Sequence, residues 1–389
     1  MSGTAVVAAI RPIPEARYAE RLRAAAQATA DVGLDALLVG VGPDLRYLTG
    51  YQAMALERLT MLVVLPGSSA LVVPLLEGPA ARAAVGSRVR IVSWEETDDP
   101  HALVASLLDE GAAGARRARV AVSDRLWASH LLRLQAALPG STFSAASGVL
   151  RELRMVKDEW EIERLSAAAA AADRVVAAIA AGRLVGRTEA DVAREVRERL
   201  VDEGHQQAEF AIVASGPNSA SPHHDASERV IGAGEPIVLD IGGSLAGYGS
   251  DITRTLWVTG GDPAKGPDDE FVRLFGLVRE AQAEAASAVR PGLPAQQIDA
   301  VARQIIAAGG YGDRFIHRVG HGIGLETHED PYLVDGNPEP LREGAAFSIE
   351  PGIYLDGRYG ARIEDIVVCG PSGPIVLNQA PRDLFVVDG

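Results

Sequence analysis

Five residues in the second half of the sequence have side chains that commonly bind metals, and their spacing suggests a single site. Four are acidic and form two pairs, and the fifth is a histidine: Asp240 with Asp251, Glu350 with Glu364, and His321. Carboxylates placed together repel one another, and divalent cations between them remove that repulsion. The chemistry that such a site supports is metal-assisted hydrolysis.

The first acidic pair is predicted to lie on a β-hairpin. Two β-rich runs flank a glycine-rich segment, and the three are Ile237–Ile241, Ile252–Val258 and Gly242–Ser250. A turn centred between Leu245 and Ala246 would place Asp240 opposite Asp251. Directly opposed residues of an antiparallel pair project from the same face of the sheet. We therefore expect these two carboxylates to lie side by side.

The second acidic pair repeats this pattern. Two apolar runs flank an Asp-Gly turn signal, and the three are Phe347–Leu355, Tyr359–Val368 and Asp356-Gly357-Arg358. A turn centred at Gly357 would set Glu350 opposite Glu364. Like charges directly opposed in a ladder are destabilising, so two such pairs require a compensating charge. A bound cation supplies it.

Acidic residues on strands usually belong to a solvated face, and each of these four would be interpreted in that way if it stood alone. Here they lie inside apolar runs such as Ile237-Val238-Leu239-Asp240-Ile241 and Ile363-Glu364-Asp365-Ile366. Buried charge is tolerated when it is paired or bound to a metal. The sequence therefore favours metal ligands over a solvated face.

Four carboxylates and one imidazole form a donor set rich in hard oxygen atoms. This set suits Mn²⁺, our first expectation, as well as Co²⁺ or Zn²⁺, and it differs from the sulfur and nitrogen ligands of structural zinc. Five protein ligands exceed what one open catalytic ion needs. Two bridging carboxylates, for which Asp251 and Glu364 are the candidates, would hold two ions roughly 3.5 to 4 Å apart.

Histidines are concentrated near these acids. Of the 8 in the chain, five fall in three short segments: His223 and His224, His317 and His321, and His328. A lone histidine is more often a hydrogen-bonded structural residue, and we assign His101 and His130 to that class. Glycines on both sides of His321 allow the backbone to approach a ligand closely.

The surrounding pattern divides the chain into two predicted domains. Residues 1–150 alternate helical and strand patterns, which indicates a small α/β domain with a mixed sheet, and 151–389 interleave helices with antiparallel hairpins, which indicates α+β. A long helix is expected at Lys157–Ala181. In the first domain Tyr47, Tyr51 and Arg58 could reach a ligand, but packing or an interface is the favoured interpretation.

Charge and cysteine content narrow the class of protein. The net charge of -15 argues against nucleic acid or an anionic membrane as a partner. Cys369 is the only cysteine, so neither an intrachain disulfide nor a thiolate metal cluster is expected. The sequence contains no apolar run long enough to span a membrane and no pattern of a secretory signal. These features are typical of a cytoplasmic enzyme.

Taken together, the motifs resemble the M24-type metallopeptidase family that includes prolidase, aminopeptidase P and methionine aminopeptidase, and whose catalytic domain has the pita-bread fold. Seven segments in order carry the resemblance, which covers nearly the whole chain. They are Ser215-Gly216-Pro217-Asn218 with Pro222-His223, Asp240-Ile241-Gly242-Gly243, Ser250-Asp251-Ile252-Thr253-Arg254-Thr255, Gly320-His321-Gly322-Ile323-Gly324, His328-Glu329, Glu350-Pro351-Gly352-Ile353-Tyr354 and Arg362-Ile363-Glu364-Asp365.

The resemblance implies a role for each matching residue. The five candidate ligands would form a dinuclear centre, and Glu350 would also accept a proton from the attacking water. His223 and His328 would contact the scissile carbonyl and neighbouring groups, and His317 would help to hold the substrate. Arg362 would contact the substrate carboxylate or, alternatively, form a salt bridge that only orients the acids.

The N-terminal domain narrows the choice within this family, because methionine aminopeptidases generally lack it. Its presence implies cleavage of Xaa-Pro bonds in small proline-containing peptides by a homodimer. A dipeptidase is favoured over an aminopeptidase that acts on longer peptides. Two further alternatives are a metal-free amidinohydrolase of the creatinase type, against which the intact ligand set argues, and a non-catalytic binding module.

Overall fold

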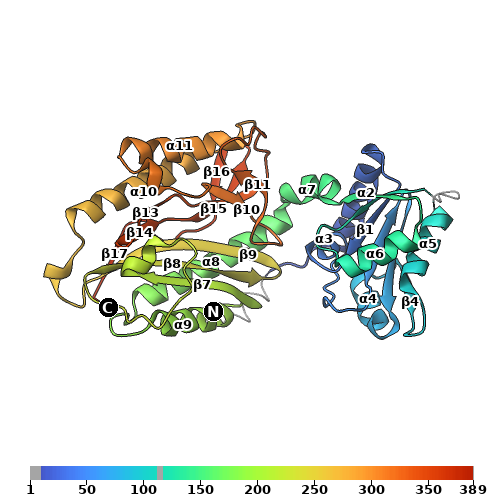
Figure 1. The fold of residues 1–389 in the computed structure, drawn as a ribbon, viewed down its shortest axis with the longest axis horizontal. Coiled ribbons are helices and arrows are strands. Elements are labelled where there is room, and N and C mark those ends of the chain that lie inside the picture. Colours follow the sequence, from blue (N-terminus) through green and yellow to red (C-terminus); the bar gives the residue numbers. More distant parts are fainter. Residues whose placement is uncertain (1–9, 112–116, 389) are drawn as a thin grey trace. The chain divides into compact units, whose positions relative to one another are not determined.

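The computed structural model describes residues 10–111 and 117–388, and these form two compact units. One unit is Pro12–Arg154, and the described residues before Pro12 and after Arg154 make up the other. Each unit has its own hydrophobic core. Both combine helices with sheets, as the sequence predicts (Figure 1).

The unit formed by Pro12–Arg154 contains a six-stranded sheet in the order β4-β3-β2-β1-β5-β6. Its strands are β1 Ala36–Gly40, β2 Met61–Leu65, β3 Ser68–Pro74, β4 Arg90–Trp94, β5 Arg119–Val122 and β6 Thr142–Ala145. β2 pairs antiparallel with both β1 and β3, whereas β3 with β4, β1 with β5 and β5 with β6 are parallel pairs. The predicted mixed sheet is confirmed.

Helices cover this sheet because its strands are apolar on both faces. The helices in this part of the chain are α2 Glu15–Asp31, α3 Pro43–Thr49, α4 Gly78–Val85, α5 Pro100–Gly111, α6 Ala128–Ala137 and α7 Ser147–Met155. Ala36 and Leu38 of β1 share a core with Leu108 of α5 and Leu134 of α6. Alternate strand residues face the opposite side, where α2 contacts β1 and β2. Sequence patterns missed three short elements here, namely α3, β6 and α7.

The other unit begins with two helices that pack on a four-stranded sheet. The helices are α8 Glu159–Ala180 and α9 Glu189–Asp202, and the strands are β7 Gln207–Ser215, β8 Glu235–Leu245, β9 Tyr248–Val258 and β17 Phe385–Val387. α8 begins with a capping box, in which Asp158 and Glu161 each accept a hydrogen bond from the backbone N–H of the other. Apolar residues of α8 and α9 share a core with β7, β8 and β9.

A second helix pair packs on the strands that follow. The helices are α10 Asp269–Ser287 and α11 Ala295–Ala308. The strands are β10 Gly320–Gly322, β11 Glu329–Leu333, β12 Ala346–Ile349, β13 Gly352–Leu355, β14 Tyr359–Arg362, β15 Asp365–Gly370 and β16 Gly373–Val376. β13 and β14 form a two-stranded ribbon, and the other five form one sheet. The two sheets of this unit meet where Thr253 of β9 bridges to Glu364.

A buried arginine fastens the two sheets together. Arg254 of β9 is 1% exposed and lies 2.7 Å from the carboxylate of Asp365 on β15, and it also donates to the backbone carbonyl of Glu364. Outside the sheets, α8 and α9 cover one and α10 and α11 cover the other (Figure 1). The inner faces of the sheets are therefore left to form a site.

The register predicted for the first hairpin is wrong by two residues. Asp240 pairs with Thr253, and Asp251 pairs with Gly242. The turn is a two-residue loop at Ala246 and Gly247, both with positive φ, as in type I′ hairpins. Most of the glycine-rich segment continues the strands instead of forming a loop. A shift of two preserves the face, so the two carboxylates still project together, diagonally instead of directly opposed.

Glycine occurs in these strands because neighbouring groups approach closely, and not because a turn is needed. A Cβ atom on Gly242 would lie 2.3 Å from Cζ of Phe210 and 2.3 Å from the carbonyl oxygen of Ser250. Phe210 of β7 pairs with Gly242 and packs across it. This use of glycine in a strand interior is indistinguishable from a loop when only the sequence is read.

The second hairpin has the predicted register but is interrupted at the two acids. Ile349 pairs with Asp365, and Gly352 pairs with Arg362, as a turn centred at Gly357 requires. The predicted continuous strands are nevertheless broken, because Glu350 and Glu364 lie in the gaps between them. Neither acid is thus part of a ladder pair with the other.

Among the described residues, no helix is long and apolar enough to cross a membrane.

Candidate metal centre

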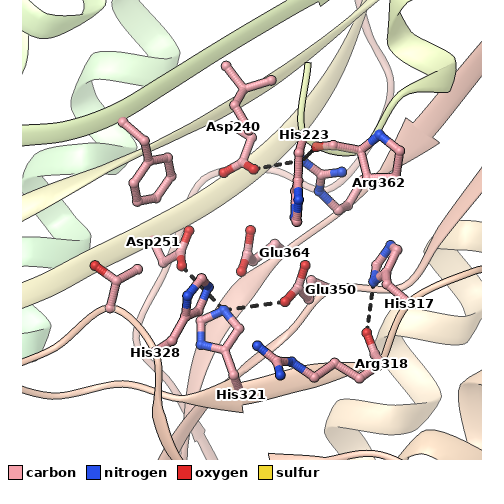
Figure 2. Close-up of a pocket in the computed structure, with 14 residues that line it drawn as sticks. His223, Asp240, Asp251, His317, Arg318, His321, His328, Glu350, Arg362 and Glu364 are labelled. Atoms are coloured by element: carbon pink, nitrogen blue, oxygen red, sulfur yellow. Dashed lines mark hydrogen bonds and ion pairs between the residues drawn. The ribbon is translucent and has the colours of Figure 1, made fainter. Parts of the chain in front are cut away.

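The five predicted ligands come from both sheets of the second unit and meet between them. Asp240 lies on β8, Asp251 on β9 and His321 on β10, while Glu350 follows β12 and Glu364 precedes β15. Figure 2 shows their side chains directed into one shared space. The structure therefore brings together all five residues that the sequence singled out.

Each break in the second hairpin is stabilised by a hydrogen bond to a different part of the unit. The backbone N–H of Glu350 donates to the carbonyl of Val319 at 2.8 Å, and that of Glu364 donates to the carbonyl of Thr253 at 3.1 Å. Pro351, which has no N–H to donate, immediately follows Glu350. Both acids are thereby turned out of their ladder.

The tightest group consists of Asp251, His321 and Glu364. One ligand atom from each lies within 4.8 Å of the others, and all three residues are buried. Nε2 of His321 lies 3.6 Å from a carboxylate oxygen of Asp251 and 3.3 Å from one of Glu350 (Figure 2). Thr253 donates its hydroxyl to Glu364 at 2.7 Å and fixes that carboxylate.

His321 is held in a form that suits a metal ligand. Its Nδ1 lies 3.1 Å from the carbonyl oxygen of Gly322, to which it can donate only when that nitrogen carries the proton. This assignment leaves the lone pair of Nε2 directed at the acids. Burial lowers the pKa of His321 to about 3, so the ring is neutral at physiological pH.

The carboxylates of this cluster are unfavourable as a set of unpaired charges. Burial, followed by repulsion from Asp240 and Glu350, raises the pKa of Asp251 well above its usual range. Burial and the charge of Asp251 do the same to Glu364. Burial raises the pKa of Glu350 to about 7. Divalent cations among these oxygens would offset both the cost of burying the carboxylates and their mutual repulsion. The residues therefore fit a metal centre.

Asp240 has one satisfied and one unsatisfied oxygen. Its Oδ2 accepts from Nη2 of Arg362 at 2.6 Å, whereas Oδ1 is buried without a hydrogen-bond partner in the described structure. A buried carboxylate oxygen without a partner is costly, and a cation is the kind of partner that satisfies it. Oδ1 therefore provides a second, independent indication that a cation is bound here.

Arg362 uses most of its donors inside the protein. Its Nε donates to the hydroxyl of Thr253, Nη1 to the hydroxyl of Tyr354, and Nη2 to Asp240 and to the carbonyl of Pro222. The residue is 2% exposed. These contacts match the orienting salt bridge, the alternative that the sequence left open for this arginine.

The three remaining candidate histidines line the same cavity of about 640 Å³, a volume within the usual range for small-molecule sites. His223 and His328 lie in irregular backbone and are exposed to the cavity. The ring of His328 meets that of His321 edge to face, with centroids 4.1 Å apart. His317 is fixed by its Nε2 contact with Tyr354, at 2.9 Å, and by its Nδ1 contact with the carbonyl of Arg318.

Family models match both parts of the chain. Residues 163–371 match Metallopeptidase family M24, and residues 21–156 match the Creatinase/Prolidase N-terminal domain. The first match spans more than half of the sequence and contains all five candidate metal ligands.

The chain belongs to metallopeptidase family M24.

Named relatives and a solved structure agree with this membership. The chain is 46% identical over 374 residues to the probable dipeptidase PepE of Mycobacterium tuberculosis, covering 95% of this chain and 96% of the relative. It is 32% identical over 354 residues to a Xaa-Pro dipeptidase of Pyrococcus horikoshii, covering 90% and 95%. The crystal structure of dipeptidase PepE from Mycobacterium ulcerans matches with a TM-score of 0.89 at 46% identity, covering 97% and 100%. The predicted family and fold are confirmed.

Sequence reasoning missed several residues that line the cavity of this M24 protein. Arg318 and Thr327 stand next to the histidines that were recognised, and Phe210 and Ile212 come from β7. The last two pair with Gly242 and Asp240, so they share the face of Asp240. An assignment of β7 as the antiparallel neighbour of β8 could have found them.

Outside this site, the residues interpreted as structural have structural contacts. His101 and His130 are buried and lie 3.2 Å apart between ring nitrogens. Tyr47 is buried and donates its hydroxyl to the carbonyl of Leu153, and Tyr51 contacts Glu77. Arg58 pairs with Glu57 and Glu96.

Proposed function

We propose that this M24 metallopeptidase hydrolyses the Xaa-Pro bond of dipeptides with two divalent cations. The cations would be held by the five candidate ligands, which are four carboxylates and one imidazole, with Asp251 and Glu364 as the bridging carboxylates. The observation that carries the proposal is the convergence of these donors with His223, His328 and His317 in one cavity. The substrate class follows that of the named relatives, which include Xaa-Pro dipeptidases.

The donor set supports Mn²⁺ as the metal, with Co²⁺ or Zn²⁺ as alternatives, because it is dominated by carboxylate oxygens. When bound, the cations supply Lewis acidity for the scissile carbonyl and make a water molecule acidic enough to attack at neutral pH. Neither contribution depends on a covalent intermediate with the protein. The remaining steps fall to side chains of this chain.

Glu350 is the proposed acceptor for the proton of the attacking water. The hydroxyl of Ser348 donates to its Oε1 at 3.3 Å and also accepts from the backbone N–H of His321 at 3.0 Å. Ser348 therefore links the carboxylate of Glu350 to the backbone of His321. Burial favours the protonated form of Glu350, which suits a group that must take up a proton and release it.

The exposed histidines are the proposed contacts to the substrate. His223 and His328 face the cavity and can donate hydrogen bonds to the scissile carbonyl as charge develops on its oxygen. His317 contributes a wall of the pocket, because both of its ring nitrogens already have partners. Arg362 is assigned to orienting Asp240.

We also propose a homodimer in the cytoplasm. The exposed large apolar residues of the Pro12–Arg154 unit include Met54, Leu56, Leu75, Leu76 and Trp127. These five residues lie in segments that precede or follow strands at the same end of the six-stranded sheet, where exposed apolar side chains would suit an interface with a second copy. The single cysteine supports a reducing compartment. Light scattering of the purified protein and cell fractionation test these two points.

The deciding experiment compares a Xaa-Pro dipeptide with the matched Xaa-Pro-Yaa tripeptide, using Mn²⁺-loaded protein, a chelated control and Glu350→Ala. Asp225→Ala, an exposed carboxylate outside the cluster, serves as the matched control variant. Cleavage of the dipeptide alone, lost on chelation and in Glu350→Ala, supports the proposal. Cleavage of the tripeptide would assign an aminopeptidase instead. Activity that survives exhaustive chelation would contradict the metal mechanism.

A further inference from the structure

His223 reaches the site from a loop and not from a regular strand. It lies between a short 3₁₀ helix, Gly216–Ala220, and β8. Within residues 10–111 and 117–388 its ring has no hydrogen-bond partner, in contrast to the ring of His317. The position of this imidazole therefore depends on what holds the backbone on either side of it.

On one side, the carbonyl of Pro222 accepts from Nη2 of Arg362 at 3.3 Å. On the other side, the ring of His224 turns away from the cavity. Its Nε2 lies 2.8 Å from Oε2 of Glu189, and its side chain is 18% exposed. The two consecutive histidines thus have different surroundings. His223 faces the cavity, and the ring of His224 is hydrogen-bonded to the buried carboxylate of Glu189.

Glu189 is an unusual partner because it is completely buried and accepts many hydrogen bonds. Thr188 caps α9, which places Glu189 in the first turn, where a negative charge is favoured. Its carboxylate accepts from the backbone N–H and hydroxyl groups of both Ser215 and Ser227, and from the amide of Asn218. One carboxylate therefore binds both ends of the segment that carries His223.

These contacts separate two functions of Glu189. The bonds to Ser215, Asn218 and Ser227 close the loop and would do so whatever stood at position 223. The bond to His224 is different, because it fixes the residue covalently next to His223 and leaves the second ring free to face the cavity. Without that bond, the peptide between the two histidines could rotate.

We propose that Glu189 is a positioning residue that sets the place of His223 in the site through His224, an inference that rests on the proposed function. Glu189 belongs neither to the candidate metal ligands nor to the residues that line the cavity. Its effect on hydrolysis is transmitted through one hydrogen bond and one peptide unit. His224 is equally a positioning residue and not a catalytic one.

A double-mutant cycle between positions 224 and 223 tests this coupling. His224→Ala is expected to lower kcat roughly ten- to hundredfold with a smaller change in KM, because it misplaces a group that acts during the reaction. In a His223→Ala background the same change should cost less than about twofold. His224→Gln, whose amide nitrogen can still donate to Glu189, should restore most of the activity. Asp225→Ala is the matched control in the same loop.

A purely structural role predicts a different result. The effects of His224→Ala and His223→Ala would then multiply, and His224→Ala would reduce kcat only in proportion to the unfolded fraction, which thermal melting measures. That outcome would overturn the proposal. A cycle in which the two losses do not multiply supports it.

A spectroscopic measurement keeps the test independent of the proposed function. Histidine labelled with ¹³C at Cε1 gives signals from the 8 histidines, and His223→Ala identifies the signal of His223 by its loss. His224→Ala should shift and narrow that signal, while His224→Gln and Asp225→Ala should leave it in place. If the wild-type protein cleaves no Xaa-Pro peptide, the proposed function is wrong. The positioning role of Glu189 and His224 is then tested by this spectrum alone. An unchanged His223 signal in His224→Ala overturns the positioning role.

Discussion

The ammonium group of Lys157 lies 2.6 Å from Oε1 of Glu329, and this ion pair is buried. The lysine side chain is fully enclosed, and that of Glu329 is 9% exposed. Lys157 also donates to the carbonyl of Met155 just before α8, and Glu329 directly follows His328. The pair therefore fastens the start of a long helix to the loop that bears a histidine of the cavity.

Removing one member of this pair should be costly. Lys157→Met is expected to lower the free energy of unfolding by about 3 to 5 kcal/mol, because Glu329 would lose its opposite charge while it stays buried. Urea unfolding monitored by tryptophan fluorescence measures the change.

The double variant Lys157→Met with Glu329→Gln provides the control, since it also removes the carboxylate charge that the single variant leaves buried. It should recover part of the lost stability. If Lys157→Met lowers the free energy of unfolding by less than about 1 kcal/mol, the ion pair contributes no more than a pair at the protein surface. The prediction for a buried pair would then be wrong.

Glu189 should make stability depend on pH in the acid range. Burial alone would raise the pKa of this carboxyl, but hydrogen bonds from Ser227, Ser215 and His224 outweigh burial and lower it from 4.5 to about 2. The folded state thus favours the ionised form. Its contribution, about 3 kcal/mol, should be complete above pH 4.5 and be lost as the pH falls towards 2.

The measurement is the difference in unfolding free energy between the wild-type protein and Glu189→Gln from pH 6 to pH 2. That difference should shrink as the pH falls, because Gln has no charge to lose. A difference that is constant across this range would contradict the assignment.

The convergence of the five candidate ligands could be predicted from sequence because their signal is local and chemical. Acids inside apolar runs are expensive, and this rule identifies Asp240 and Glu364 without any knowledge of the register. The predicted register of the first hairpin, in contrast, was wrong by two residues. Gly242 and Gly243 were interpreted as loop residues, whereas they are strand residues over which Phe210 and the backbone of Gln207 pack.

The supporting contacts could not be predicted, because they join residues far apart in the sequence. Lys157 and Glu329 are separated by 172 positions, and Glu189 and His224 by 35. Charged residues near the start of a helix are ordinarily explained by capping and the helix dipole. Only the three-dimensional structure shows that Glu189 accepts its hydrogen bonds from another segment.

Gly242 provides a test of the close packing over the first hairpin. Gly242→Ala is expected to destabilise the protein by about 1 to 3 kcal/mol or more, since its Cβ would overlap Phe210 and the carbonyl of Ser250. Gly276, in the middle of α10, is the matched control because a Cβ there meets nothing within 4 Å. Gly276→Ala should instead stabilise the protein by roughly 0.5 to 1 kcal/mol. Equal effects at both positions would refute this description of the packing.

Metal loading should reverse the order of stability between the wild-type protein and Glu364→Gln. Without a cation, Glu364 is buried beside the like charge of Asp251, so a neutral glutamine should raise the melting temperature. Thr253 can still donate to the amide oxygen of Gln, so the local hydrogen bond survives. With Mn²⁺ the wild-type protein should gain about 4 kcal/mol at a thousandfold excess over Kd, and the variant much less.

Thermal melting in chelator and in Mn²⁺ tests this reversal, with Asp225→Asn as the control for an exposed carboxylate. The control should follow the wild-type protein under both conditions. If Glu364→Gln is the less stable protein in chelator as well, then repulsion between buried acids is not what the cation relieves. The cluster would in that case be stabilised by its own hydrogen bonds, and the proposal that Glu364 is a bridging ligand would be wrong.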